Sequence, residues 1–427
     1  MATALFMGFT VLMLLRVPIA MAIGGAVLVT LIWGGYGDGL YIVPQQVLEG
    51  VDNASLVAVP FFILTGNLMN VSGMTDKIFN FAMTLVGHMK AGLAQVNVLA
   101  SMIFAGVNGT AVGDIAGLGQ LEVKAMRERG YPADFAAALT VASSVVGPII
   151  PPSVGLVVYA FLSNTSVARL FLGGIIPGIL VGISLMIFNR VYAVRFNIPT
   201  QPRASFVEIA RSAGDGIAAL VAPGIIMGAI ITGFTTATEA GVLACAYALV
   251  VGLIYRQLTW KHVWRALTDT MLMTTVVMII VGFSTVMGWL LAIEQAPQRL
   301  AHAMLSLTDS KPVFLALLIV FFLIIGCFVE GVPAKLILVP ALLPITDAYG
   351  VDRIHFGLII QLGLLIGIAT PPMGIGLYVV SEVARVPFEK VTIAIMPMLI
   401  PLIIVLILIT YFPILTLFMP NLIMGPE

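Results

Sequence analysis

The sequence predicts an all-α protein that crosses a membrane many times and contains two inverted repeats. Of its 427 residues 60% are hydrophobic and only 9% are charged, whereas a soluble domain carries about 25% charged residues. The apolar runs are continuous rather than alternating, which excludes a β-barrel, and no polar stretch is long enough for a soluble domain. Two segments also share a pattern of glycine and proline, which indicates an internal repeat.

Composition also excludes several classes of function. Twenty basic and twenty acidic residues cancel, which argues against both a polybasic nucleic-acid binder and an acidic tail. Cys245 and Cys327 have no spacing typical of a zinc site or a disulfide framework. The chain contains no nucleotide-binding loop, no Ser/His/Asp arrangement and no metal triad, so we do not expect an enzyme.

The apolar runs give the expected membrane spans in order. At about 20 residues per crossing the chain has room for roughly a dozen full or partial spans. The clear full-length candidates are residues 58–75, 170–188, 216–232, 240–254, 271–293 and 391–418. Residues 1–35 are too long for a signal peptide, and Arg16-Val17-Pro18 predicts a break or a turn between two short segments.

The repeat relates two regions that do not read as simple spans. Pro151-Pro152 recurs as Pro371-Pro372, 220 residues later. The same offset, without a gap, superimposes Gly106 on Gly326, Gly130 on Gly350, Gly147 on Gly367 and Pro177 on Pro397. Paired interruptions at corresponding positions of two halves are typical of the central site of a transporter.

Each repeat is predicted to form a re-entrant helical hairpin followed by a broken helix. The first has arms at 95–106 and 112–126 around the tip Asn108-Gly109-Thr110, then helix 133–146, a break at 147–152 and a second half at 153–162. The second has arms at 313–325 and 333–345 around a tip at 327–331, then helix 354–367 and a break at 368–372. We therefore divide the chain into scaffold helices at 1–91, a first transport unit at 92–169, connecting and scaffold helices at 170–311, a second transport unit at 312–390, and a C-terminal scaffold helix at 391–427.

Unwound segments in a membrane survive where they line a cavity or a buried site, because unpaired backbone groups are costly in hydrocarbon. Their carbonyl oxygens suit a hard cation such as sodium, and their free amides suit a carboxylate. The candidate sodium ligands are Asn108, Gly109, Thr110, Gly147, Pro148 and Pro151 in the first repeat, and Glu330, Gly331, Ala369, Thr370 and Pro372 in the second. The candidate substrate-binding residues are Thr110, Asp114, Ser153 and Thr370, and no lysine or arginine is evident near a tip. Glu239 is better explained as a helix cap than as a ligand.

The distribution of charge predicts the orientation. Basic residues gather at the open end of the first hairpin and in the connector between the repeats, whereas residues 34–55 are acidic and carry no lysine or arginine. Basic loops tend to stay in the cytoplasm, so the first hairpin should open inward and the second outward. The C-terminus is then expected outside, on the periplasmic side of a bacterial inner membrane.

Five motifs resemble the large membrane subunit of tripartite ATP-independent periplasmic (TRAP) transporters. They are Asn108-Gly-Thr-Ala, Gly130-Tyr, Gly147-Pro-Ile-Ile-Pro-Pro-Ser153, Thr236-Ala-Thr-Glu-Ala240 and Thr370-Pro-Pro-Met-Gly374, and the resemblance covers essentially the whole chain. It implies an elevator-type, sodium-coupled importer of an organic acid such as sialic acid or a C4-dicarboxylate. It also implies two partners, a small four-helix membrane subunit and a periplasmic substrate-binding protein. Thr236-Ala-Thr-Glu239 lacks the proline that the family commonly shows there.

Two alternatives belong to other functional classes. An ion channel could use the hairpins as pore loops, but a channel would more often repeat identical tips. An intramembrane enzyme is the weakest alternative, because no paired catalytic residues are evident. The inverted, matched breaks favour the transporter.

Overall fold

The computed structural model confirms the predicted fold class. It describes residues 2–15, 17–34, 40–53, 56–192, 202–295, 299, 308 and 310–426, and within these ranges the chain forms helices and no strands. Seven of the described helices are long and apolar enough to cross a membrane, and shorter apolar helices accompany them. The polytopic architecture expected from composition is therefore present.

The N-terminal helices lead up to the first repeat. Helices α1 (Ala2–Leu14) and α2 (Ile19–Trp33) pack against each other, which confirms a turn between two short segments near Pro18. They are followed by α3 (Ile42–Val51), α4 (Ala58–Val71) and α5 (Met74–Val86). The single span predicted for residues 58–75 is wrong, because Gly73 adopts a left-handed conformation (φ 75°) that ends α4 and starts α5.

The first repeat forms the predicted hairpin and broken helix. The hairpin arms are α6 (Gly92–Asn108) and α7 (Ala111–Glu128), and the broken helix consists of α8 (Ala133–Ser144) and α9 (Val154–Ser163). The long helix α10 (Val167–Tyr192) follows. Local signals account for this agreement, since glycine ends α6 while Thr110 and Ser153 cap α7 and α9.

Three long helices connect the repeats: α11 (Phe206–Ile231), α12 (Ala237–Ile254) and α13 (Trp260–Ile293). The predicted cap at Glu239 is confirmed. The Thr236 amide donates to the Glu239 carboxylate at 2.7 Å, and the Glu239 amide donates to the Thr236 hydroxyl at 3.3 Å. This reciprocal arrangement satisfies two amides at the start of α12.

The second repeat contains α15 (Lys311–Phe328), α16 (Gly331–Ala348), α17 (Arg353–Ile368), α18 (Ile375–Ala384) and α19 (Phe388–Tyr411), and α20 (Ile414–Met424) ends the fold. Its unwound tip is shorter than the predicted 327–331, because only Val329 and Glu330 separate the two arms. The span predicted for 391–418 is present as α19, but it ends earlier than predicted. The predicted range divides between α19 and α20 at Phe412-Pro413, where proline has no amide to continue the helix.

The two repeats correspond element by element. Helices α7 and α16 begin and end 220 residues apart, Gly130 and Gly350 both have positive φ (85° and 62°), and both Pro-Pro bonds are cis. Their contacts are reciprocal: α7 packs against α18 and α16 against α9, while α8 packs against α19 and α17 against α10. Exchanging the repeats preserves this pattern, which indicates an approximate twofold relation.

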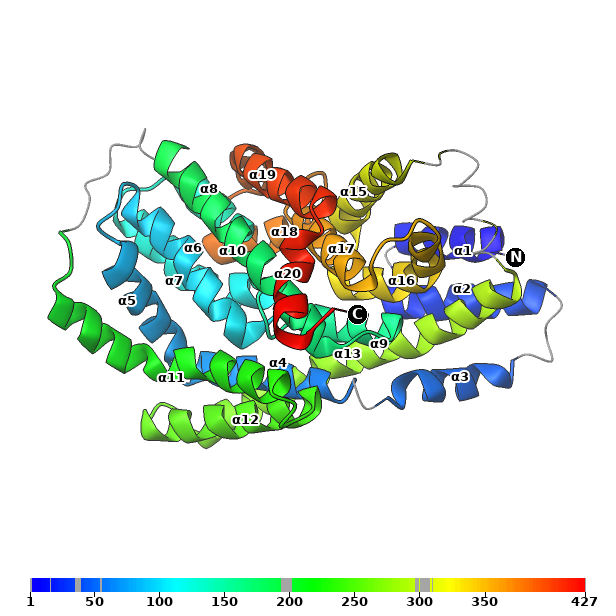
Figure 1. Ribbon diagram of the computed structural model, residues 1–427, viewed down its shortest axis with the longest axis horizontal. Coiled ribbons are helices and arrows are strands. Elements are labelled where there is room, and N and C mark those ends of the chain that lie inside the picture. Colours follow the sequence, from blue (N-terminus) through cyan, green and yellow to red (C-terminus); the bar gives the residue numbers. More distant parts are fainter. Residues whose placement is uncertain are drawn as a thin grey trace.

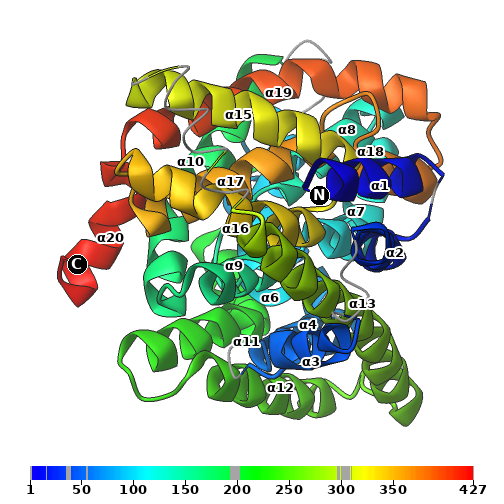
Figure 2. The same cartoon turned by 90° about the vertical axis from the view of Figure 1, so that its right-hand side faces the viewer.

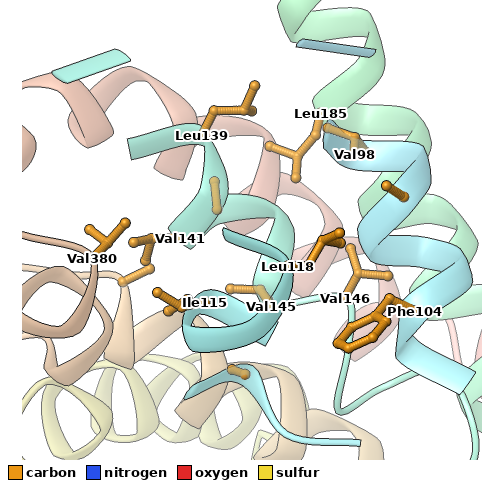
Figure 3. Close-up of a cluster of buried hydrophobic side chains, with 14 of the residues drawn as sticks. Val98, Phe104, Ile115, Leu118, Leu139, Val141, Val145, Val146, Leu185 and Val380 are labelled. Atoms are coloured by element: carbon orange, nitrogen blue, oxygen red, sulfur yellow. The ribbon is translucent and has the colours of Figure 1, made fainter. Parts of the chain in front are cut away.

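The two edges of the molecule are formed by different groups of helices. Helices α4, α11 and α12 lie along one edge of the molecule, and α15 and α19 lie along the opposite edge (Figure 1). Helix α13 crosses obliquely in the perpendicular view (Figure 2) and contacts α2, α3, α4 and α16. Between the edges, an apolar core joins α6, α7 and α8 to α10 and α18, with residues such as Ile115, Val141 and Val380 facing one another (Figure 3).

Candidate functional site: a cavity between the hairpin tips

The first hairpin tip lies directly against the first break. Gly109 ends α6 in a left-handed conformation (φ 63°), and a Cβ atom there would lie 2.8 Å from the Pro152 carbonyl oxygen. The Thr110 hydroxyl then accepts a hydrogen bond from the Gly113 amide at 3.2 Å and starts α7. The tip and the break are therefore neighbours, as the sequence predicted. The side chain of Asn108 lies outside the described part of the structure.

The first break is organised around the Pro148 carbonyl. This oxygen accepts a hydrogen bond from the Ser153 hydroxyl at 2.5 Å and another from the Gln361 side-chain amide at 2.7 Å. Gln361 belongs to α17, so the second repeat helps to fix the break of the first. Both lone pairs of the Pro148 oxygen are engaged, and a sodium ion could use this carbonyl only after one of the two bonds breaks.

The second tip and the second break meet through backbone contacts. The Gly374 amide donates to the Cys327 carbonyl at 3.0 Å, and the Thr370 hydroxyl donates to the Ile366 carbonyl at 2.7 Å. Gly326 approaches α17 so closely that a Cβ atom would lie 2.6 Å from the Leu364 carbonyl oxygen and 2.9 Å from the Gly367 Cα. Only glycine fits at this crossing, which is one of the matched positions of the repeat.

Both tips open onto one cavity of about 40 Å³ at the junction of the repeats. Its volume suits one to three water-sized groups or a carboxylate. The wall contains Gly109, Thr110, Ala111, Val112, Pro148, Val154, Gly155, Glu330, Gly331, Val332, Lys335, Gln361, Leu365 and Ile368. Candidate site residues of the first repeat and of the second repeat therefore line the same cavity.

Five of the sequence-predicted site residues lie in this wall, namely Gly109, Thr110, Pro148, Glu330 and Gly331. The others do not: Gly147, Pro151, Ser153, Ala369, Thr370 and Pro372 belong to the breaks behind the wall, and Asp114 lies deeper along α7. The cavity that Thr110 lines therefore does not include Asp114, Ser153 or Thr370. The Ser153 hydroxyl donates to the Pro148 carbonyl and caps α9, and the Thr370 hydroxyl donates to the Ile366 carbonyl.

Lys335 lies near the tips, in the cavity wall, although the sequence did not point to it. The expectation that no basic residue lies near a tip is therefore wrong. Lys335 sits on α16 five residues after Glu330, and only 1% of its surface is exposed. Its ammonium donates to the Gly155 carbonyl at 3.0 Å and to the Gln361 side-chain oxygen. Within the described chain no carboxylate lies within 4.0 Å of it. A lone lysine in an apolar helix is itself a functional signal that could have identified it.

The cavity is electrostatically suited to an anion. The first two residues of α7, α9 and α16 all line it: Ala111 and Val112, Val154 and Gly155, and Gly331 and Val332. Each of these helix N-termini carries free amides and a partial positive charge. Lys335 and Glu330 lie in the same wall with formal charges of opposite sign, so the remaining positive potential comes from the helix N-termini. A bound carboxylate would complement this excess of positive potential.

Two related repeats that meet at a cavity, in a chain with seven described helices apolar enough to cross a membrane, are typical of a membrane transporter. Residues 6–415 match the family described as the DctM component of the tripartite ATP-independent periplasmic transporter. The chain therefore belongs to the DctM family of TRAP transporter large permeases, and it is not a member of an enzyme family.

Individual proteins agree with this assignment. The chain is 46% identical to the sialic acid TRAP transporter large permease SiaM of Vibrio cholerae over 91% of both chains. It is 38% identical to the 2,3-diketo-L-gulonate TRAP transporter large permease YiaN of Escherichia coli, over 87% of this chain and 88% of that one. The YdaH transporter of Alcanivorax borkumensis shares the fold, with a TM-score of 0.63 and 16% identity over 88% and 89% of the two chains.

Proposed function

We propose that this chain is the permease of a sodium-coupled importer of an organic acid. The observation that carries the proposal is the cavity at which both hairpin tips, the first break and Lys335 meet. One carboxylate of the substrate would occupy the cavity and face the helix N-termini and the Lys335 ammonium. Family membership supports a tripartite system that also contains a small membrane subunit and a periplasmic binding protein.

Sodium would bind behind the cavity wall, where the tips meet the breaks. The proposed oxygen donors are those of Asn108, Gly109, Thr110, Gly147 and Pro151 at one tip and of Glu330, Gly331, Ala369, Thr370 and Pro372 at the other. Two observations support this placement: the tips lie against the breaks, and the cavity itself favours negative rather than positive charge. A cation on each side would then attract the carboxylate between them, so sodium and substrate would raise each other's affinity.

Sialic acid is the proposed cargo, and a C4-dicarboxylate is the second candidate. Support for sialic acid comes from sequence identity, since the relative named for sialic acid is 46% identical and the relative named for 2,3-diketo-L-gulonate is 38% identical.

We further propose an elevator motion in which the hairpins and broken helices move against α11–α13 and the N-terminal helices. The small subunit would have four helices, and the C-terminus would face the periplasm of the inner membrane.

The channel alternative is not supported, because the two tips differ. One is Asn108-Gly109-Thr110 and the other is Val329-Glu330, whereas a pore built from two loops would require similar filters.

Sodium coupling is tested with the whole system in proteoliposomes. With both partners present, sialic acid uptake should require an inward sodium gradient, and Asn108→Ala and Thr370→Ala should each raise the sodium concentration for half-maximal uptake several-fold. Uptake that continues unchanged when potassium replaces sodium would refute coupling. A normal sodium response in both variants would refute the assignment of the tips.

A further inference from the structure

A second polar region lies inside the first hairpin, away from the cavity. Asp114 projects from α7 into the packing between α6, α7 and α8, and only 3% of its surface is exposed. Neither of its carboxylate oxygens has a hydrogen-bond partner. Its neighbours along α7, Ile115 and Leu118, belong to the apolar core shown in Figure 3. An isolated carboxylate in such surroundings costs several kcal/mol unless a positive charge accompanies it.

One hydroxyl lies beside this carboxylate, and a second hydroxyl lies next to the first. Ser101 on α6 is adjacent to Asp114, and its hydroxyl donates to the Ser143 hydroxyl on α8 at 3.2 Å. The Ser143 hydroxyl in turn donates to the Thr140 carbonyl at 3.1 Å. Both serines are completely buried. The oxygens of Asp114, Ser101 and Ser143 therefore come together from three different helices.

The protein supplies no counter-charge for this group. The buried basic side chains of the described chain are Arg169 and Lys335, which bond to the Gly425 carbonyl and to the cavity residues respectively. Glu122 lies eight residues further along α7, about 12 Å away at the rise of an α-helix, and it adds a second buried carboxylate rather than a counter-charge. Its carboxylate already accepts hydrogen bonds from Asn97 at 2.7 Å and Thr140 at 3.3 Å.

We infer that Asp114, Ser101 and Ser143 bind one monovalent metal cation with the size and oxygen preference of sodium. The carboxylate supplies the charge and up to two oxygens, and the serine hydroxyls supply the others. This site lies inside the hairpin, one helical turn beyond the Thr110 cap, and it is additional to the two sites proposed at the tips. A cation bound here would hold the arms α6 and α7 to the broken helix.

Sodium binding to the purified complex tests the inference without transport. Asp114→Asn keeps the shape of the side chain and removes its charge, so it should bind one sodium ion fewer per chain than the wild type in an equilibrium assay with radioactive sodium. Its melting temperature in sodium-free choline chloride should be higher than that of the wild type, because no buried charge remains uncompensated. Ser143→Ala should retain the site with several-fold weaker sodium affinity.

The matched control is Glu128→Gln, which removes an exposed carboxylate from the end of the same helix and should leave the number of bound ions unchanged. Equal sodium binding by the wild type and Asp114→Asn would overturn the inference and indicate that Asp114 is simply protonated. The outcome is distinct from failure of the tip sites. If those sites do not exist, the wild type still binds one ion and Asp114→Asn binds none.

Discussion

Replacing Lys335 with methionine is expected to raise the substrate concentration for half-maximal uptake roughly 10- to 150-fold. A hydrogen bond to a charged group contributes about 1.5–3 kcal/mol, which corresponds to that range of affinity. Among the described residues of the cavity wall Lys335 is the one basic side chain, and its ammonium donates hydrogen bonds to Gly155 and Gln361. The measurement is initial uptake against sialic acid concentration at saturating sodium.

This effect can be separated from a folding defect. Methionine has a similar length, but it leaves the Gly155 carbonyl and the Gln361 side-chain oxygen without their donor, so the melting temperature should fall modestly while the protein still folds. Lys311→Met is the matched control, because Lys311 lies exposed at the start of α15 and bonds to the Gly350 carbonyl at 2.6 Å. An unchanged half-saturating concentration in Lys335→Met would show that the carboxylate does not bind at this cavity.

The second large effect is expected from Gly367→Ala, which should strongly reduce the yield and the melting temperature of the folded protein. A Cβ atom at Gly367 would overlap the backbone of Gly326 and lie 3.0 Å from the Cys327 amide nitrogen. Side chains can rotate away from a clash, but two backbones at a helix crossing cannot. Overpacking in a core costs about 1–3 kcal/mol even where side chains can adjust, so the cost here should reach or exceed that range.

The control for this prediction is Gly228→Ala on α11. No atom lies within 4 Å of the added methyl group there, and alanine favours the helix by up to about 1 kcal/mol relative to glycine. Both variants are compared by gel filtration and thermal unfolding in detergent. A melting temperature for Gly367→Ala equal to that of the wild type would show that α15 and α17 are not packed as closely as described.

Local signals explain why the hairpins and breaks could be predicted from the sequence. Gly109, Thr110 and Ser153 act on their own stretch of chain, ending or capping helices irrespective of what packs nearby. The 220-residue offset then transferred the same interpretation to the second repeat. The errors at residues 58–75 and 391–418 have the opposite origin, because continuous hydrophobicity conceals a turn that one glycine or proline creates.

The composition of the site could not be predicted in the same way. The bonds from Lys335 to Gly155 and from Gln361 to Pro148 join residues 180 and 213 positions apart, on different repeats. No local pattern specifies such pairs. For the same reason Asp114 was assigned to the substrate from its closeness to Thr110 in sequence, whereas its direction on α7 points it into the hairpin instead.

Protection of a single cysteine tests most directly whether the cavity is the sodium-dependent substrate site. In a background with Cys245 and Cys327 replaced, Val332→Cys places a thiol in the cavity wall and Val313→Cys places a control thiol on the exposed face of α15. Sialic acid should slow modification of the Val332→Cys thiol by a small reagent when sodium is present, but not in potassium, and should not affect the control. Modification of both thiols at rates independent of sialic acid and sodium would contradict the account.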